Sequence, residues 1–195
     1  MPVYQVNREI VESKTFRSID YSINKLDGDE FENCAFVNCN FSNSDLSGIA
    51  FLECEFKGCD LSNAKLSDTA FKDVRFISCK LLGLQFNNCS EILLSFTFED
   101  CQMNLASFYQ LKLKGTEFKM CNLHEVDFTQ TDLSHTLFNE CNLIKAVFAD
   151  TNLEKVDFRS SFSYSIDPEK NRIKKAKFSR SSVSGLLEKY DIEID

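Results

Sequence analysis

Large apolar residues recur at every fifth position through most of the chain. The first series contains Phe16, Tyr21, Leu26, Phe31, Phe36, Phe41, Leu46, Phe51, Phe56, Leu61, Leu66, Phe71, Phe76, Leu81 and Phe86. The second series is two residues out of step and contains Leu93, Phe98, Met103, Phe108, Leu113, Phe118, Leu123, Phe128, Leu133, Phe138, Leu143, Phe148, Leu153 and Phe158. Phe96 fits the first series and Leu93 the second, so the exact place of the slip between Phe86 and Phe98 stays open. This period matches neither an α-helix, which repeats about every 3.6 residues, nor a strand, which repeats about every two. We therefore predict a chain that bends after each short extended segment and brings one residue in five to a common interior.

The residues around each large apolar residue, which we call the centre, also repeat. All nine cysteines lie two positions before a centre, with Cys89 at the edge of the break, and share that offset with many Ala, Val and Thr residues. Two positions after a centre lie several Asn and Asp residues and the glycines Gly28, Gly48, Gly58, Gly83 and Gly115. Gly tolerates a positive φ, and Asn or Asp can hydrogen-bond the local backbone, so this second offset predicts a corner.

Several of these five-residue units resemble the A(D/N)LXX consensus of the pentapeptide-repeat family. They are Ser44-Asp45-Leu46-Ser47-Gly48, Cys59-Asp60-Leu61-Ser62-Asn63 and Thr131-Asp132-Leu133-Ser134-His135. The resemblance implies an all-β fold, a right-handed quadrilateral β-helix in which four units make one coil and equivalent residues recur every 20 positions. The expected organisation is an N-terminal cap over 1–14, a β-helix over 15–160 with a register break near 87–97, and a C-terminal tail over 161–195.

The cysteines are interpreted as small buried residues. The 20-residue period predicts one column of Cys39, Cys59 and Cys79 and a separate column of Cys101, Cys121 and Cys141. A tetrahedral metal site cannot be built from side chains on one line, so we expect neither a metal nor a cofactor.

The tail is expected to form an amphipathic α-helix, because Val183, Leu186, Leu187 and Tyr190 follow the spacing i, i+3, i+4 and i+7. Ile192 and Ile194 alternate with acidic residues and can add a short strand. These six residues can cover the last coil as a lid, form the interface of a homodimer, or do both.

The net charge of −8 argues against direct binding of nucleic acid, because neutralising phosphates requires Lys and Arg. The residue before the centre is often acidic, and the expected partner-binding acidic face contains Glu30, Asp45, Glu55, Asp60, Asp127, Asp132 and Asp157. The alternative is a solvated face whose charges serve solubility.

Catalysis and membrane insertion are not expected from this sequence. His124 and His135 fall at outward offsets without a nucleophile pattern, so no catalytic residue is assigned. The longest aliphatic run, Ile92-Leu93-Leu94, is too short to cross a bilayer, and we expect a cytoplasmic protein.

The tail resembles a narrower group, the quinolone-resistance and the microcin or albicidin immunity pentapeptide proteins. The similarity lies in 166–173, Gly185-Leu186-Leu187-Glu188-Lys189 and Ile192-Glu193-Ile194. It implies a homodimer joined through the C-terminal tail that mimics DNA, binds DNA gyrase or topoisomerase IV, and modulates or protects it. The long projecting loops of the quinolone-resistance type are missing here. The second hypothesis is a non-catalytic interaction scaffold for another partner.

Overall fold

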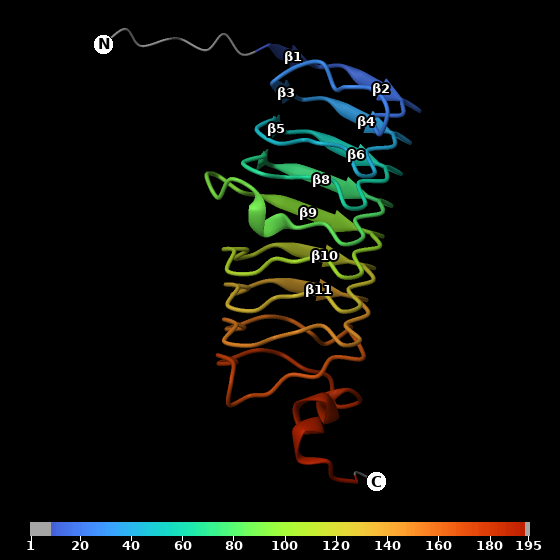
Figure 1. The fold of residues 1–195 in the computed structure, drawn as a ribbon. Coiled ribbons are helices and arrows are strands. Elements are labelled where there is room, and N and C mark those ends of the chain that lie inside the picture. The colour runs from blue at the N-terminus through green and yellow to red at the C-terminus, as the bar shows by residue number, and fades with distance from the viewer. Residues whose placement is uncertain (1–8, 194–195) are drawn as a thin grey trace, which may run out of the picture.

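The computed structural model describes residues 9–193 as a column of stacked coils (Figure 1). Two parallel sheets run along it. One has the order β1-β3-β5-β7, with bounds Ile10–Glu12, Glu30–Glu32, Ala50–Leu52 and Ala70–Lys72. The other runs from β11 through β10, β9, β8, β6 and β4 to β2, with bounds Leu137–Asn139, Glu117–Lys119, Phe96–Glu99, Val74–Ile77, Glu55–Lys57, Ala35–Val37 and Thr15–Arg17. The expected all-β β-helix is confirmed.

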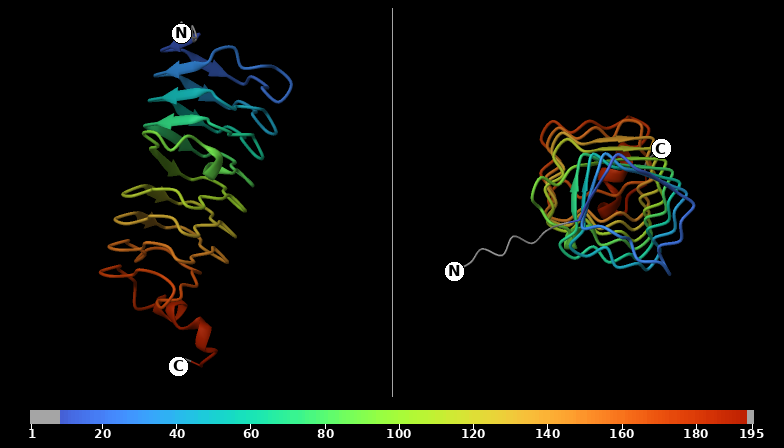
Figure 2. Two further views of the ribbon diagram at one scale, coloured as in Figure 1. Left: turned by 60° about the vertical axis from the view of Figure 1, so that its left-hand side comes forward. Right: turned by 90° about the horizontal axis from the view of Figure 1, so that it is seen from above.

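Each coil has four sides, and the column shows a four-sided outline from above (Figure 2). We number the sides in chain order by their centres. Side 1 carries Phe36 and β4, side 2 carries Phe41, side 3 carries Leu46, and side 4 carries Phe51 and β5. Sides 2 and 3 are joined by isolated parallel bridges, such as that between Asp45 and Lys65. Strand pairing advances by 20 residues per coil over most of the column, as between Phe36 and Phe56.

The centres point inward, as predicted, and form the core. Phe31, Phe51, Phe118 and Leu133 have no exposed surface. Rings one coil apart stack, with centroids 4.9 Å apart for Phe16 and Phe36 and 5.0 Å for Phe118 and Phe138. Rings on different sides of a coil meet edge to face, a preferred aromatic geometry, both on neighbouring sides, as in Phe51 and Phe56, and on opposite sides, as in Phe108 and Phe118.

The small residue two positions before the centre does more than fill space, because its side chain donates a hydrogen bond to a centre carbonyl of the preceding coil. Thr131 Oγ1 lies 2.8 Å from Phe108 O, and Thr151 Oγ1 lies 2.8 Å from Phe128 O. Cys59 Sγ makes the equivalent, weaker contact to Phe36 O at 3.2 Å. Cys and Thr at this offset therefore fill the space and add a donor, whereas Ala64, Val74 and Val126 at the same offset only fill it.

Every regular corner has a left-handed residue, as predicted for the position two after the centre. Asn43 has φ 56° and Gly58 has φ 64°. The following N–H closes the turn on the centre carbonyl, as Ser44 N does on Phe41 O at 3.0 Å. Gly58 has a second reason to be Gly, because a Cβ there would collide with Asn38 Oδ1.

The register break is an insertion of two residues between Cys89 and Phe96. Cys89 still follows Thr69 by 20 positions, as shown by Asp68 N bonding Asn88 O, whereas Val74 pairs with Phe96, 22 positions on. The prediction that Leu93 is a centre of the second series is wrong, because Leu93 is 69% exposed. It lies on a loop, 90–95, that projects from the column before β9 (Figure 1).

The insertion also corrects the cysteine columns. Lys80 pairs with Gln102, so the coil of Cys79 stacks directly on that of Cys101. Cys39, Cys59, Cys79, Cys101, Cys121 and Cys141 therefore form one column, and the two predicted columns are its halves. A fixed period of 20 could not reveal this, because the two extra residues shift the numbering without shifting the side.

The coil also extends beyond both expected boundaries. β1 already pairs with β3 inside the expected N-terminal cap, and residues 1–8 of that cap lie outside the described residues. At the other end Asp157 bridges Lys177, and the Phe158 and Phe178 rings stack at 5.4 Å. The regular column thus continues to Phe178, well into the expected tail.

The expected C-terminal α-helix is wrong in type. The tail forms two 3₁₀ helices, η2 (Val183–Leu186) and η3 (Glu188–Tyr190), while a third, η1 (Phe86–Asn88), lies before the insertion. Gly185 favours helix poorly, and Asp191 turns left-handed with φ 49°, so the segment is too short to sustain α-helix. None of the helices described over 9–193 is long and apolar enough to span a bilayer.

Candidate partner-binding surface

Most of the predicted acidic residues hold the turn that follows them. In each of five aspartates, Oδ1 accepts a hydrogen bond from the backbone N–H two residues later. The acceptors are Asp45 (3.0 Å), Asp60 (3.0 Å), Asp127 (2.9 Å), Asp132 (3.0 Å) and Asp157 (3.2 Å). Asn40 and Asn152 accept the same bond at 3.0 and 3.2 Å. Because neutral Asn serves as well as Asp, this offset selects a side-chain oxygen and not a charge.

The seven predicted residues do not lie on one face. Side 1 holds Glu55 and Asp157, and side 2 holds Asp60. Side 3 holds Asp45 and Asp127, while side 4 holds Glu30 and Asp132. A period of five places these residues outward but says nothing about which side each one occupies. To assign each residue to a side, one must know that a coil has 20 residues and that the coil with the insertion has 22.

Several of the acidic groups pair with a base one coil further on. Nitrogen and oxygen lie 2.7 Å apart for Arg75 and Glu55, 3.8 Å for Lys65 and Asp45, and 3.9 Å for Lys80 and Asp60. Lys119 pairs with Glu99 at 2.7 Å and Lys145 with Glu125 at 3.4 Å in the same way. Opposite charges 20 positions apart could therefore have predicted these ion pairs from the sequence. The five-residue analysis did not compare positions that far apart.

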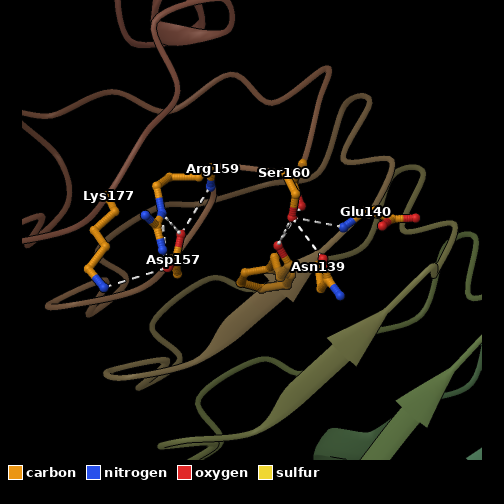
Figure 3. Close-up of polar contacts among 8 residues, drawn as sticks. Asn139, Glu140, Asp157, Arg159, Ser160 and Lys177 are labelled. Carbon is orange, nitrogen blue, oxygen red and sulfur yellow. Dashed lines mark hydrogen bonds and ion pairs between the residues drawn. The ribbon is translucent and has the colours of Figure 1, made fainter.

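Asp157 pairs with two basic residues of the column (Figure 3). Its carboxylate contacts Arg159 at 2.8 Å and Lys177 of the next coil at 3.6 Å. The hydrogen bond from Arg159 is the main reason why the pKa of Asp157 is lowered. The pKa of Asp45 is likewise lowered, chiefly by the hydrogen bonds from Ser47. Both groups are charged at neutral pH, but their carboxylates already bind residues of the column.

An acidic patch lies instead on side 4 near the N-terminal end. Sheet pairing places Ile10 beside Glu30 and Glu12 beside Glu32. Glu12 and Glu32 are exposed, Glu30 is half-buried, and Asp29 and Glu53 are exposed at the adjoining corners. We call Glu12, Asp29, Glu30, Glu32 and Glu53 the acidic patch. Like charges on directly opposed strand residues destabilise a sheet, so strand pairing does not explain why Glu12 and Glu32 are both acidic.

The opposite end of side 4 is basic. Arg172 bridges Asn152 on this side, and Lys174 and Lys175 follow it. One side of the column therefore runs from acidic at the first coils to basic at the last, although the chain as a whole carries −8.

The two histidines lie in separate surroundings. His124 contacts Asn104 at 3.4 Å and Glu125 at 3.4 Å, while His135 lies 3.5 Å from Lys155. Within residues 9–193 no group of three or more His, Cys, Asp or Glu residues is arranged to hold a metal ion. Burial raises the pKa of the Cys54 thiol to about 12, so that thiol is protonated at neutral pH.

The tail closes the last coil as a lid. Gly185 O accepts a bond from Ile166 N at 2.9 Å, and a Cβ on Gly185 would collide with Tyr164 O. Lys189 Nζ lies 2.7 Å from both Asp167 and Glu169. These contacts bind η2 and η3 to the same chain.

The predicted interface residues divide into two sets. Leu186 packs against the core and Leu187 is half-buried, so these two serve the lid. Val183, Tyr190 and Ile192 are exposed by 44, 53 and 56%. Ile194 lies outside the described residues.

This chain is similar to known proteins by family model and by structure. A family model described as "Pentapeptide repeat region" matches residues 29–91, 49–128 and 112–186. The structure of full-length QnrB1, a plasmid-mediated fluoroquinolone resistance protein, is similar with TM-score 0.51 and 19% identity, covering 94% of this chain and 100% of QnrB1. HetL, involved in heterocyst differentiation regulation in the cyanobacterium Nostoc sp., matches with TM-score 0.43 and 14% identity, covering 86% of this chain and 84% of HetL. No curated protein sequence matches the chain significantly.

Proposed function

This chain belongs to the pentapeptide repeat family, and from that premise we propose that it is a cytoplasmic, non-catalytic protein that binds a type II topoisomerase in place of DNA. The target is DNA gyrase or topoisomerase IV, whose activity the bound protein modulates or protects. The acidic patch is the main support, because it gathers five carboxylates on and beside one side of the column, four of them exposed. A basic groove that binds DNA phosphates is complementary to such a surface.

The test is inhibition of gyrase supercoiling by the purified protein. Inhibition should weaken as salt screens the charges over about 10 Å at 0.1 M ionic strength. A triple variant, Glu12→Gln, Glu32→Gln and Glu53→Gln, should inhibit at least roughly tenfold less well, since three exposed charges are lost from one surface.

The matched control removes three charges elsewhere. Asp45→Asn, Asp60→Asn and Asp127→Asn keep the side-chain oxygen that closes each turn, and inhibition should change little. Equal weakening by both triples would contradict a localised binding surface. Absence of binding to gyrase and topoisomerase IV at low salt would refute the topoisomerase proposal.

A scaffold for another protein is the second candidate, and the cross-coil ion pairs favour it. Charges such as Glu55 and Asp60 are engaged by Arg75 and Lys80, which makes the rod less like a uniform line of phosphates. In that case the acidic patch still binds a basic surface, but not that of a topoisomerase.

We also propose that two copies join through the tail. Val183, Tyr190 and Ile192 are the exposed apolar residues on the lid, and an interface between two lids would bury them. Val183→Asp with Ile192→Asp should give a monomer in sedimentation that keeps its β-sheet circular dichroism. A wild-type protein that sediments as a monomer would refute this dimer.

A further inference from the structure

The hydrogen-bond ladder on side 4 is interrupted where the two residues are inserted. In the regular coil below, Asp132 N bonds Leu111 O at 2.9 Å, and Leu113 N bonds Asp132 O at 2.8 Å. Above the interruption, Ser90 N bonds Thr69 O and Ser95 N bonds Phe71 O at 2.9 and 3.0 Å. Among the described residues, nothing bonds the N–H or C=O of Lys112 or the C=O of Lys114. One rung of the column is therefore missing.

The residues that would form this rung lie in the loop 90–95, which leaves the regular path of the coil. Ile92 and Leu93 lie beside Ala50, Leu52 and Ala70 of β5 and β7, on the outer surface of the coils above. The backbone that a regular coil would place against Lys112 is thus displaced toward the N-terminal end. Asp73 N, which would otherwise face that backbone, bonds Ser95 Oγ at 2.7 Å instead.

A groove of about 460 Å³ occupies the vacated space. Its upper wall is Leu94, Ser95 and Phe96, and its lower wall runs from Lys112 to Thr116. Asp73, Arg75 and Glu117 also line it. The groove thus combines an apolar wall with the open polar edge of an extended backbone.

The charged groups along the lower wall favour an acidic occupant between Lys112 and Lys114, and the exposed carboxylate of Glu117 lies beyond the end of this wall. Arg75 is engaged by Glu55, and the Asp73 carboxylate accepts the Ser95 hydroxyl at 3.0 Å. Lys112 and Lys114 are exposed on the lower wall and form no ion pair within residues 9–193. Two unpaired ammonium groups thus flank the open backbone edge.

We propose that this groove receives an extended peptide segment of a partner protein in which apolar and acidic residues alternate. The segment restores the missing rung by bonding the open groups of Lys112 and Lys114, as in β-strand addition. Alternation is required because successive side chains of an extended segment point to opposite sides, so the apolar ones can contact Leu94 and Phe96 while the acidic ones reach the lysines. This site is distinct from the acidic patch and does not depend on the topoisomerase proposal.

The experiment is a fluorescence-anisotropy titration of the full chain with the labelled peptide acetyl-Glu-Val-Glu-Val-Glu-amide. We expect saturable binding. A peptide of the same sequence with N-methylated backbone amides at both valines should bind at least roughly tenfold more weakly, because it loses its ladder donors. Equal binding of the two peptides would overturn strand addition.

Protein variants locate the binding site. Lys112→Glu with Lys114→Glu should weaken binding about tenfold or more through charge reversal, while the control Lys155→Glu with Lys175→Glu should stay within about twofold of wild type. Deletion of Ile92 and Leu93 restores a 20-residue coil, should close the groove and should abolish binding, with circular dichroism reporting the fold. Wild-type affinity in the Lys112 and Lys114 double variant, or no saturable binding at all, would overturn the proposal.

Discussion

The coils before and after the insertion share one backbone plan and fill it differently. Before it, Phe occupies neighbouring sides 4 and 1, as Phe51 and Phe56 do, and their rings meet edge to face at 5.2 Å. After it, Phe occupies opposite sides 1 and 3, while side 4 carries Leu113, Leu133 and Leu153. The strands follow this change, because side 4 forms a sheet only before the insertion. The total side-chain volume inside a coil is thus kept more strictly than the choice of which sides carry the Phe residues.

The hydrogen-bond donors differ in the same way. Six of the nine cysteines precede the insertion, whereas Thr131, Thr136 and Thr151 follow it. Both residue types donate to a centre carbonyl, but at 2.8 Å from Thr131 and 3.3 Å from Cys54. Thiol donors therefore predominate before the insertion and hydroxyl donors gain after it, although Thr69 donates in the first half and Cys141 in the second.

The largest expected effect comes from emptying the core of the first half. Phe51→Ala should lower the free energy of unfolding by about 3–5 kcal/mol, because it removes a ring that contacts Phe31, Phe36, Phe56 and Phe71. Leu133→Ala, on the same side of the second half, should cost about 2–5 kcal/mol. Urea denaturation measures both. A cost below about 1 kcal/mol for Phe51→Ala would contradict the packing described for side 4.

The donor difference can be tested next. Thr131→Val keeps the shape but leaves Phe108 O without this donor and should cost about 1–3 kcal/mol. Cys54→Ala removes only a weak S–H bond and a small volume, and about 1 kcal/mol is expected. A larger loss for Cys54→Ala than for Thr131→Val, again from urea denaturation, would reverse the assignment of bond strengths.

Alkaline pH should distinguish the halves further. Burial raises the pKa of Cys54 from 9.0 to about 12, and the stability that this supplies is complete below pH 9 and is lost as pH rises toward 12. The loss is about 1 kcal/mol at pH 10 for such a thiol. The pKa of Tyr21 is also raised to about 12 by burial, and this residue lies in the same half. The pKa values of Cys101, Cys141 and Tyr164 are raised in the second half. The first half holds more such groups, since those of Cys59 and Cys89 are raised there as well. Hydrogen exchange should therefore accelerate first in residues 10–89 as pH rises. Uniform acceleration along the chain would argue against this difference.

The smallest effect is expected at the surface. Glu55→Gln removes the ion pair with Arg75 and should change stability by about 0–1 kcal/mol, with any change reduced by salt. Thermal melts in low and high salt measure it. A loss above about 2 kcal/mol would show that the pair is coupled to the ladder beneath it.

Much of the fold was predictable because each inward residue repeats its neighbour's chemistry. The five-residue period identified Phe51 and Leu133 as core and Gly58 as a corner without any knowledge of the coil. The side on which a residue lies was not predicted, because a slip of two counted within a five-residue period does not show how many units of the four-sided coil the break spans. For the same reason the sequence analysis placed Cys79 and Cys101 in different columns and assigned acidic residues from four sides to one face. The acidic patch is a property of the pairing between β1 and β3, which the period alone does not contain.

The missing rung has a mechanical consequence. Each coil is held only by its neighbours, so tension applied at the two ends loads all rungs in series, like links of a chain. Such an assembly yields first at its weakest link, which here is the interval between loop 90–95 and Lys112. Under force the column should part into two blocks at this point, and an inserted peptide would raise the force at which they separate.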